Sequence, residues 1–262
     1  MKELQQIIRG VADNPSRSWA LATLVQTEGS TYRQRGARML IDTNGDTIGV
    51  LSGGCLEEEI SRHGRNVIAG RVPVLLSFAT KRLYGCDGYL KILIEPLAPA
   101  RVNGNLITKI GRSLDDREVC RVRVCFEGEM LGSALLPADA LVAEQSGILI
   151  DTVSLPIRLL LFGSGPEVEP ISEIAGALGW VLERYGYPSE LPEDFRRDEQ
   201  TAALVMNHNF GRDFLALNRL LSLRLRYVGL LGPRKRHAEL LARLSEYRPF
   251  DFDAGRPLLR PQ

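Results

Sequence analysis

The sequence has few of the residues on which metal sites and disulfide frameworks depend. Its 262 residues include only four cysteines and three histidines. The histidines, His63, His208 and His237, show no ligand spacing relative to one another, which argues against a structural zinc site. The four cysteines are expected to be thiols rather than disulfides, because the sequence is typical of a cytoplasmic protein.

Long apolar runs and a charge imbalance are also missing. No run of about 18 apolar residues occurs, so the sequence predicts no membrane span. The first residues, Met1 to Gln6, lack the apolar core of a signal peptide, and we therefore expect a cytoplasmic location. A net charge of +1 gives no electrostatic basis for binding nucleic acid or an anionic membrane. The absence of G-x-x-x-x-G-K-[ST] excludes a P-loop NTPase.

The chain is long enough for two ordinary α/β domains. Its hydrophobic content of 44% and charged content of 25% are those of a globular protein. Leu155-Pro156 is the expected junction. We expect a mixed α/β domain over residues 1–155. Residues 156–262 should form a Rossmann-like parallel-sheet domain with an irregular tail from Tyr247 onward.

The stretch 49–59, G-V-L-S-G-G-C-L-E-E-E, is the centre of the predicted first domain. The aliphatic run 47–51 has the composition of a buried strand, and a helix-favouring segment follows Ser52-Gly53-Gly54-Cys55. Such a turn would present free backbone N–H groups and a positive helix end to a ligand. Cys55 would then be an exposed, reactive or ligand-binding thiol. Alternatively, the glycines only make a tight turn and Cys55 is a small core residue.

Two neighbouring features could belong to the same site. The polar loop 28–37 contains Arg33 and Arg35, which would approach the glycine turn only if the loop folds back. Cys86 lies between Gly85 and Gly88 at the start of another predicted strand. Two cysteines beside glycines at strand ends are less expected by chance than one, which favours a functional role for both. Alternatively, both could be turn residues whose thiols have no function. Cys120 and Cys125 are predicted on opposite faces of one strand and are poor partners for one metal.

Hydrophobic periodicity predicts the remaining elements. We expect an amphipathic helix from the N-terminus to about residue 13. The predicted strands are 19–25, 38–41, 47–51, 72–78, 89–95, 119–126, 147–153, 157–162, 180–185, 201–206 and 227–231, and the further helices are 57–69, 103–114, 166–178, 213–221 and 234–244.

The second half opens like a dinucleotide-binding unit. An apolar strand is followed by Gly163-Ser164-Gly165 and a helix, which is the arrangement of a phosphate-binding turn. Val168 replaces the third glycine of G-x-G-x-x-G, and Glu183, the candidate ribose-binding acid, could lie inside the second strand. The pattern therefore favours a phosphate-binding turn and argues against an intact NAD site.

Polar residues follow the next two predicted strands, where ligands bind in open α/β sheets. His208 lies at the carboxyl end of 201–206 and is either a site residue or a cap of the strand end. Arg234, Lys235 and Arg236 begin the last helix, where their charge opposes the helix dipole. They indicate either a nearby anion or a solvated basic turn.

Several motifs together resemble the XdhC/CoxI family, whose members are accessory proteins for the maturation of molybdenum hydroxylases such as xanthine dehydrogenase. The motifs are E-G-S-x-Y-R-x-x-G-A-R-M-L (28–40), S-G-G-C-L-E (52–57), G-C-x-G before I-L-I-E-P-L (85–97), L-F-G-x-G-P (161–166), V-M-x-H-N (205–209) and Y-V-G-L-L-G-P-R-K-R (227–236).

The resemblance implies a two-domain protein that binds molybdenum cofactor (molybdopterin), protects it during exchange of an oxo for a sulfido ligand, and delivers it to the apo-hydroxylase. It also implies a cysteine desulfurase partner and a homodimer. Cys55 is the residue expected to contact the metal, since a soft thiolate suits molybdenum. The other cofactor-binding residues expected are Ser52, Gly53, Gly54, Glu57, Cys86 and Arg35 in the first domain, with Gly163, Gly165 and His208 at a nucleotide-type turn in the second.

Three functions remain open at the level of sequence. A non-catalytic carrier would bind a pterin tightly without turnover. An NAD(P)-dependent oxidoreductase would use the turn at Gly163. A paralogue that has lost its cofactor would retain only partner binding, although the presence of both Cys55 and Cys86 argues against this third interpretation.

Overall fold

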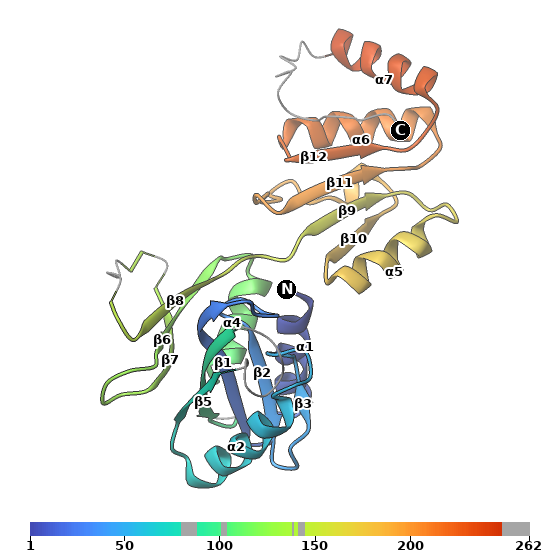
Figure 1. Ribbon diagram of the computed structural model, residues 1–262. Coiled ribbons are helices and arrows are strands. Elements are labelled where there is room, and N and C mark those ends of the chain that lie inside the picture. Colours follow the sequence, from blue (N-terminus) through green and yellow to red (C-terminus); the bar gives the residue numbers. More distant parts are fainter. Residues whose placement is uncertain (80–87, 101–103, 138, 141–144, 248–262) are drawn as a thin grey trace. The chain divides into compact units, whose positions relative to one another are not determined.

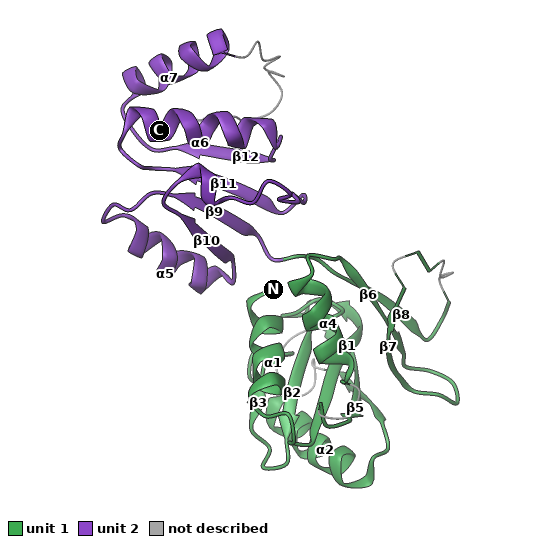
Figure 2. Cartoon of the chain, turned by 180° about the vertical axis from the view of Figure 1, so that it is seen from behind, with its two compact units in different colours: residues 1–155 green, residues 156–262 purple. Residues whose placement is uncertain are grey.

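The computed structural model describes residues 1–79, 88–100, 104–137, 139–140 and 145–247. The chain divides into two compact units, Met1–Leu155 and Pro156–Gln262, which are coloured separately in Figure 2. Each contains its own strands and its own helices (Figure 1). None of the helices in the described ranges combines the length and the apolar character needed to cross a membrane.

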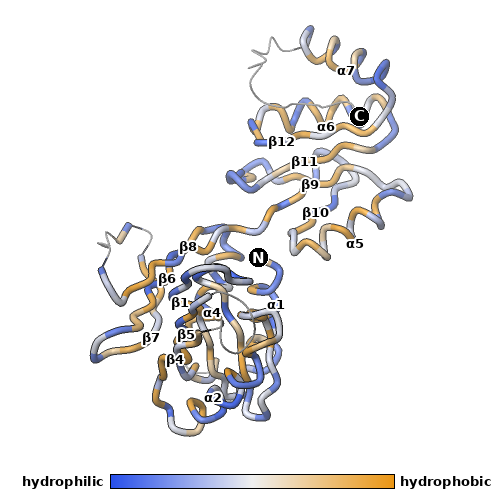
Figure 3. The backbone as a smooth tube through the Cα atoms, viewed as in Figure 1, coloured by the Kyte–Doolittle hydropathy of each residue, from blue (hydrophilic) through white to orange (hydrophobic). Residues whose placement is uncertain are grey.

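The first unit is built on a five-stranded antiparallel sheet of order β3-β2-β1-β5-β4. Its strands are β1 (Trp19–Gly29), β2 (Arg38–Asp42), β3 (Thr47–Ile48), β4 (Val74–Ala79) and β5 (Gly88–Leu97). The central strand β1 is buried on both faces, which explains why its run W-A-L-A-T-L-V is apolar except for Thr23. Figure 3 shows apolar residues along the strands of both units.

Both faces of this sheet are covered. On one face, Ala20 and Leu24 pack with Ile60 and Val67 of α2 (Glu57–Gly70). On the other face, the alternate residues of β1 pack with α1 (Lys2–Asp13), α4 (Leu106–Asp115) and a second sheet. The predicted helices at the N-terminus and at 57–69 are confirmed. The helix predicted over 103–114 begins only at Leu106, because the side chain of Asn105 caps it by accepting a hydrogen bond from the Thr108 amide.

The second sheet has the order β7-β6-β8 and consists of β6 (Cys120–Cys125), β7 (Gly132–Leu136) and β8 (Ile148–Val153). The predicted strands at 119–126 and 147–153 are confirmed. Sequence patterning does not predict β7, which is short and half-buried. Cys120 is buried and Cys125 half-buried, in keeping with their predicted positions on opposite faces of β6.

The prediction of a buried strand over 47–51 is wrong. Only Thr47 and Ile48 pair with β2, and Thr47 is exposed. The chain leaves the strand at Gly49, whose φ of +97° lies in the left-handed region. A Cβ on Gly49 would stand 2.5 Å from the Arg38 carbonyl oxygen, so this turn requires glycine. Leu51 is fully buried but lies outside the strand.

The second unit is a parallel sheet of order β10-β9-β11-β12, as predicted for a Rossmann-like fold. Its elements in chain order are β9 (Arg158–Phe162), α5 (Val168–Leu178), β10 (Val181–Tyr185), the short 3-10 helix η1 (Pro188–Glu190), β11 (Thr201–Val205), α6 (Phe210–Ser222), β12 (Tyr227–Leu230) and α7 (Arg234–Tyr247). The order of strands reverses between β9 and β11, which creates a topological switch point at that position.

Helices cover both faces of the parallel sheet. Leu160 and Phe162 of β9 pack with α6 and α7, whereas Leu161 packs with Val168 of α5 on the opposite face. The helix predicted over 213–221 starts earlier, at Phe210, because the Asn209 side chain accepts a hydrogen bond from the Arg212 amide and caps it. The predicted irregular tail beyond residue 247 lies outside the described residues.

Candidate functional site

The glycine turn before α2 presents Cys55 to solvent. Gly53 and Gly54 have φ values of +79° and +110°, which side-chain-bearing residues adopt only with strain. The Cys55 thiol is free and exposed, so the alternative interpretation of a small core residue is wrong. No heavy atom lies within 4 Å of the position that a Cβ on Gly54 would occupy. A ligand can therefore approach the backbone beside the thiol.

The carboxylate of Glu57, the first residue of α2, folds back into this turn. Its Oε1 accepts the amides of Leu51 at 3.0 Å and Ser52 at 2.7 Å. Its Oε2 accepts the Ser52 hydroxyl at 2.6 Å and the amides of Gly54 at 2.8 Å and Leu56 at 3.2 Å. Burial raises the pKa of Glu57, but the hydrogen bonds from Ser52 and Leu51 outweigh it and leave the pKa below its usual value. The turn thus contains its own bound anion.

This arrangement corrects one expectation from the sequence. Amides that should have been free for a ligand are hydrogen-bonded to Glu57. Ser52 is occupied in the same way, because its hydroxyl donates to Glu57 and accepts the Leu56 amide at 2.8 Å. Ser52 and Glu57 therefore hold the turn in shape, while Gly53, Gly54 and Cys55 form its outer surface.

The loop between β1 and β2 folds back over the turn through an aromatic residue. The ring of Tyr32 lies against Gly53, where a Cβ would come within 3.2 to 3.4 Å of three ring carbons. Tyr32 is nevertheless 72% exposed. Arg33 turns the other way and forms an ion pair with Glu3 of α1, and Arg35 is exposed. Sequence reasoning considered the arginines of this loop and missed Tyr32. The only signal for it was the presence of an aromatic residue in a polar loop.

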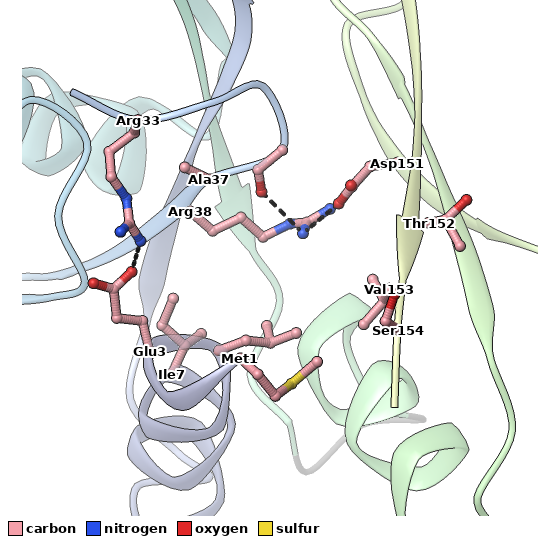
Figure 4. Close-up of a pocket in the computed structure, with 12 residues that line it drawn as sticks. Met1, Glu3, Ile7, Arg33, Ala37, Arg38, Asp151, Thr152, Val153 and Ser154 are labelled. Carbon is pink, nitrogen blue, oxygen red and sulfur yellow. Dashed lines mark hydrogen bonds and ion pairs between the residues drawn. The ribbon is translucent and has the colours of Figure 1, made fainter. Parts of the chain in front are cut away.

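The motif residues after Tyr32 line a cavity of about 270 Å³ in the first unit (Figure 4). Arg38 is buried there and donates from Nη1 to Asp151 of β8 at 2.7 Å and to the Gly36 carbonyl at 3.2 Å. A Cβ on Gly36 would lie 2.6 Å from the Asp151 carboxylate, so glycine is required for this contact. The ion pair between Arg38 and Asp151 ties the loop to the second sheet, a role that no sequence pattern indicates.

In the second unit, the carboxyl ends of β9 and β11 bring Gly163, Gly165 and His208 together at the switch point. A Cβ on Gly163 would stand 2.8 Å from the Met206 carbonyl oxygen, and one on Gly165 would stand 3.7 Å from the His208 ring. His208 itself has a φ of +54°. Its Nε2 is 3.4 Å from a carboxylate oxygen of Glu167, which occupies the N-cap position of α5. Three residues predicted as one site are therefore neighbours.

The exposed side chain of Glu167 at this switch point works against binding of the pyrophosphate of a dinucleotide. Glu167 places a carboxylate oxygen 2.5 Å from the Cβ position of Gly165, in the hollow that a phosphate-binding glycine keeps open. A second negative charge there would be repelled. Glu183 lies inside β10 and accepts the Tyr185 hydroxyl at 2.7 Å, so it does not stand at the strand end where a ribose-binding acid is needed. Just after β10, Glu190 accepts a hydrogen bond from the Gly186 amide.

Arg236 of the predicted basic turn is engaged within the protein. It forms an ion pair with Asp213 of α6, which is fully buried and also accepts the backbone and side-chain amides of Asn207 at 3.1 Å each. This network joins the end of β11 to α6 and α7. It gives Arg236 a structural partner in place of the external anion that the sequence suggested.

The remaining thiols do not add to a metal site in the described ranges. Cys86 lies outside the described residues. Burial raises the pKa of the Cys120 thiol, which favours its neutral form. Within the described part of the chain, no three side chains of His, Cys, Asp or Glu gather in a way that could hold a metal ion.

The fold and the site define a class: an α/β protein whose first unit displays a cysteine on a glycine turn and whose second unit is Rossmann-like. Comparison with known proteins identifies the family. Residues 13–79 match the XdhC and CoxI family, and residues 159–254 match the XdhC Rossmann domain. The chain belongs to the XdhC/CoxI family.

Two curated relatives match most of the chain. One is named as a probable xanthine dehydrogenase subunit of Bacillus subtilis (strain 168) and is 25% identical over 269 residues, with 85% of this chain and 82% of the relative covered. The other is the "Molybdenum cofactor insertion chaperone PaoD" of Escherichia coli (strain K12), which is 21% identical over 232 residues, with 86% and 70% covered.

A solved structure shares the fold. The crystal structure of a xanthine dehydrogenase from Bacillus halodurans superposes with a TM-score of 0.78 at 22% identity, covering 92% of this chain and 85% of the other. The predicted fold class, a mixed α/β unit followed by a Rossmann-like parallel sheet, is confirmed.

Proposed function

We propose that this protein is an accessory factor that binds molybdenum cofactor, assists its sulfuration, and inserts it into a molybdenum hydroxylase of the xanthine dehydrogenase type. Family membership and the relative named as a molybdenum cofactor insertion chaperone support an accessory role. The name of the Bacillus subtilis relative supports a target of the xanthine dehydrogenase type. In this proposal the protein is a carrier rather than an enzyme.

One structural observation supports the cofactor-binding half of the proposal more than any other. The Cys55 thiol is exposed at a turn whose shape is fixed by five hydrogen bonds to Glu57. A thiol on a rigid, open turn can contact a soft metal without rearrangement of the backbone. Gly54 would allow close approach, and the exposed Tyr32 ring, which lies against Gly53, would form one wall.

The residues present fit the metal end of the cofactor and do not provide a phosphate site at the start of α2. The molybdenum cofactor would supply the metal centre that the hydroxylase uses, and Cys55 would contact the metal from one side. Glu57 already fills the anion position of the turn, so a phosphate on the same ligand has to lie outside it. Ser52 and Glu57 would act as positioning residues, and Arg35 is exposed and able to reach a ligand anion.

The remaining parts of the proposal concern assembly. A cysteine desulfurase would deliver sulfur, the apo-hydroxylase would receive the cofactor, and the protein would act in the cytoplasm as a homodimer. These expectations follow from the family resemblance.

The first test is retention of the cofactor by the purified full-length protein. The retained pterin is oxidised to its fluorescent form and quantified for the wild type, for Cys55→Ala, and for Cys125→Ala as a matched control in the same unit. We expect near-stoichiometric pterin in the wild type and the control, and a loss of at least about tenfold in Cys55→Ala, since a metal–thiolate contact is removed. Unchanged retention in a folded Cys55→Ala protein would remove this residue from the site.

A parallel NADPH titration separates the carrier from an oxidoreductase. Saturable NADPH binding in a protein that retains no pterin would overturn the carrier proposal. The carboxylate of Glu167 in the glycine turn leads us to expect no such binding at the switch point.

A further inference from the structure

A second cavity lies at the opposite edge of the parallel sheet from the glycine turn. It measures about 710 Å³, within the range of small-molecule sites. Ile157 precedes β9, while Thr201 and Tyr227 begin β11 and β12, so the cavity opens at the amino ends of these strands. Five-residue strands separate it from the switch point by about 16 Å. All its lining residues belong to the second unit.

One wall of this cavity is held in place by a buried arginine. Arg158 donates to the Thr201 hydroxyl at 3.0 Å, to the Arg196 carbonyl at 2.7 Å and to Asp198 at 3.2 Å. Its guanidinium also stacks 4.4 Å from the ring centroid of Phe195. These contacts hold the segment 195–201 against Arg158 of β9. The lining residues on that segment are therefore preorganised, which reduces the entropy lost on binding.

The cavity has an excess of positive charge. Its charged lining residues are three arginines, Arg197, Arg224 and Arg226, and one acid, Glu199, which leaves an excess of two positive charges. Glu199 lies 3.7 Å from Arg197. Among the residues that the structure describes, neither Arg224 nor Arg226 has a side-chain hydrogen bond or an ion pair. Two guanidinium groups are thus available for an anion.

The backbone around these arginines is shaped to present them. Arg224 has a φ of +50°, a conformation that is uncommon for a residue with a side chain. Leu225, between the two arginines, is buried and anchors the segment in the core. The strained turn at Arg224 and the buried anchor direct both flanking side chains to the surface, where both are exposed.

An aromatic ring beside the arginines forms a flat platform. The Tyr227 ring lies along its own strand over Gly229, where a Cβ would come within 3.0 Å of Cε1 and of the hydroxyl oxygen. The missing side chain of Gly229 therefore allows the ring to lie close to the backbone. Tyr227 remains 45% exposed, which leaves ring surface for another planar group to stack on.

We propose that this cavity binds a small molecule in which a phosphate or pyrophosphate group is attached to a flat ring system, as in a nucleoside diphosphate. Arg224 and Arg226 would contact the phosphates, because guanidinium groups match phosphate oxygens in bidentate geometry. Tyr227 would stack on the ring. The juxtaposition of two unpaired guanidinium groups with an exposed ring in one preorganised cavity supports this assignment. It is independent of the cofactor-carrier function proposed above.

The test is isothermal titration calorimetry of ADP into the full-length protein. We expect saturable binding at one site per chain. The Arg224→Gln/Arg226→Gln double variant should weaken binding at least about tenfold, because charge-assisted hydrogen bonds are lost. The control is Arg234→Gln/Lys235→Gln, which removes the same charge at the start of α7 and should bind ADP as the wild type does. Melting temperatures establish that each variant is folded.

Two further arms test the role of the ring. Tyr227→Leu should weaken ADP binding about five- to tenfold or more, whereas Tyr227→Phe should preserve it, because base stacking needs the ring and not the hydroxyl. Binding of inorganic pyrophosphate should depend on the two arginines and be unaffected by Tyr227→Leu. If Tyr227→Leu bound ADP as tightly as the wild type, the assignment of the flat ring would be overturned.

Three other outcomes would overturn the site itself. They are absence of saturable ADP binding, binding that is unchanged in Arg224→Gln/Arg226→Gln, and binding that is lost in the control double variant or in His208→Ala. The last result would place the ligand at the carboxyl edge of the sheet. Retention of pterin by the wild type, measured separately, is unaffected by any of these outcomes.

Discussion

At the scale of single residues, two glutamates determine what the glycine turns of this protein can bind. Glu57 accepts hydrogen bonds inside the turn before α2, and Glu167 stands beside Gly165 in the turn before α5. Turns of this kind elsewhere bind external phosphates through free amides. Here a side chain of the protein supplies the negative charge. The first turn is thereby specialised to display Cys55 rather than to bind an anion.

Replacing Glu57 with Gln should destabilise the first unit. The variant keeps the size of the side chain but loses the charge and one acceptor oxygen, so several donors of the turn lose their partner. We expect a decrease of about 1–2 kcal/mol in the free energy of unfolding at pH 7. Urea denaturation measures it, and Glu58→Gln is the control, because Glu58 is exposed in the same helical turn and has the same charge.

The effect of Glu57 should also depend on pH with a definite sign. The pKa of Glu57 in the folded protein is lowered from its usual value of 4.5, so its ionised form stabilises the fold. This contribution is complete above the unfolded pKa and is lost as the pH falls through the folded pKa. The stability difference between wild type and Glu57→Gln should therefore shrink below about pH 4.5. A difference that is constant from pH 7 to pH 3 would contradict this assignment.

At the scale of elements, the turn after β9 depends on close contact with the end of β11. A Cβ on Gly163 would lie 2.8 Å from the Met206 carbonyl oxygen and 2.7 Å from its Cγ, and the carbonyl cannot move freely because the Met206 amide bonds to Phe162. Packing here leaves no room for a methyl group. The two central strands can end side by side only because residue 163 is glycine.

Gly163→Ala should therefore lower the stability of the second unit by about 1–3 kcal/mol through steric strain. The matched control is Gly176→Ala in α5, where nothing lies within 4 Å of the added Cβ and the glycine is exposed. That substitution should stabilise the protein by about 0.5–1 kcal/mol, because it restricts the unfolded chain and favours the helix. Thermal unfolding of both variants measures these changes in stability. Equal effects of the two substitutions would disprove the packing argument.

Most elements of the fold could be predicted because their sequences are buried in regular ways. The strands β9 and β11 are apolar along their whole length, since both faces of a parallel sheet are covered. The strand β7 escaped prediction because it is short and only half-buried, which leaves no clear alternation. The run 47–51 was wrongly predicted as one buried strand because Leu51 is buried without belonging to a strand.

Sequence reasoning predicted the glycine turn and its exposed thiol but not the residues around them. Gly53, Gly54 and Cys55 indicate a turn with a thiol by residue type alone. The inward rotation of Glu57 and the contact of Tyr32 with Gly53 depend on side-chain directions and on pairing between distant segments, which leave no periodic signal. The contact between Arg38 and Asp151 joins residues more than 100 positions apart and is invisible for the same reason.

At the scale of the whole molecule, each unit has hydrophobic core clusters of its own among the described residues. The core of the second unit, as far as it is described, draws its residues from 160–244 only, while the first unit draws on residues from 7 to 155. The sheets in the described ranges also each belong to one unit. We therefore propose that each unit is a domain.

Expressed alone, residues 156–262 should fold and unfold cooperatively, because no described core residue is supplied by the first unit. Circular dichroism during urea denaturation, together with the dispersion of amide NMR signals, measures this. Residues 1–155, prepared in the same way, serve as the companion protein. Collapsed NMR signals and a non-cooperative transition for residues 156–262 would show that its core is incomplete.

The carboxylate of Glu57 also has a consequence for the timing of ligand exchange. Because five hydrogen bonds from the turn end on this side chain, the turn is ordered before any ligand arrives. Ligand binding therefore need not order a flexible segment, and after ligand release the amides that donate to Glu57 keep their hydrogen bonds. In the proposed carrier, residence time at Cys55 would then be set by the contacts of the ligand itself. A partner that competes for those contacts would take the ligand directly, without waiting for the turn to unfold and refold.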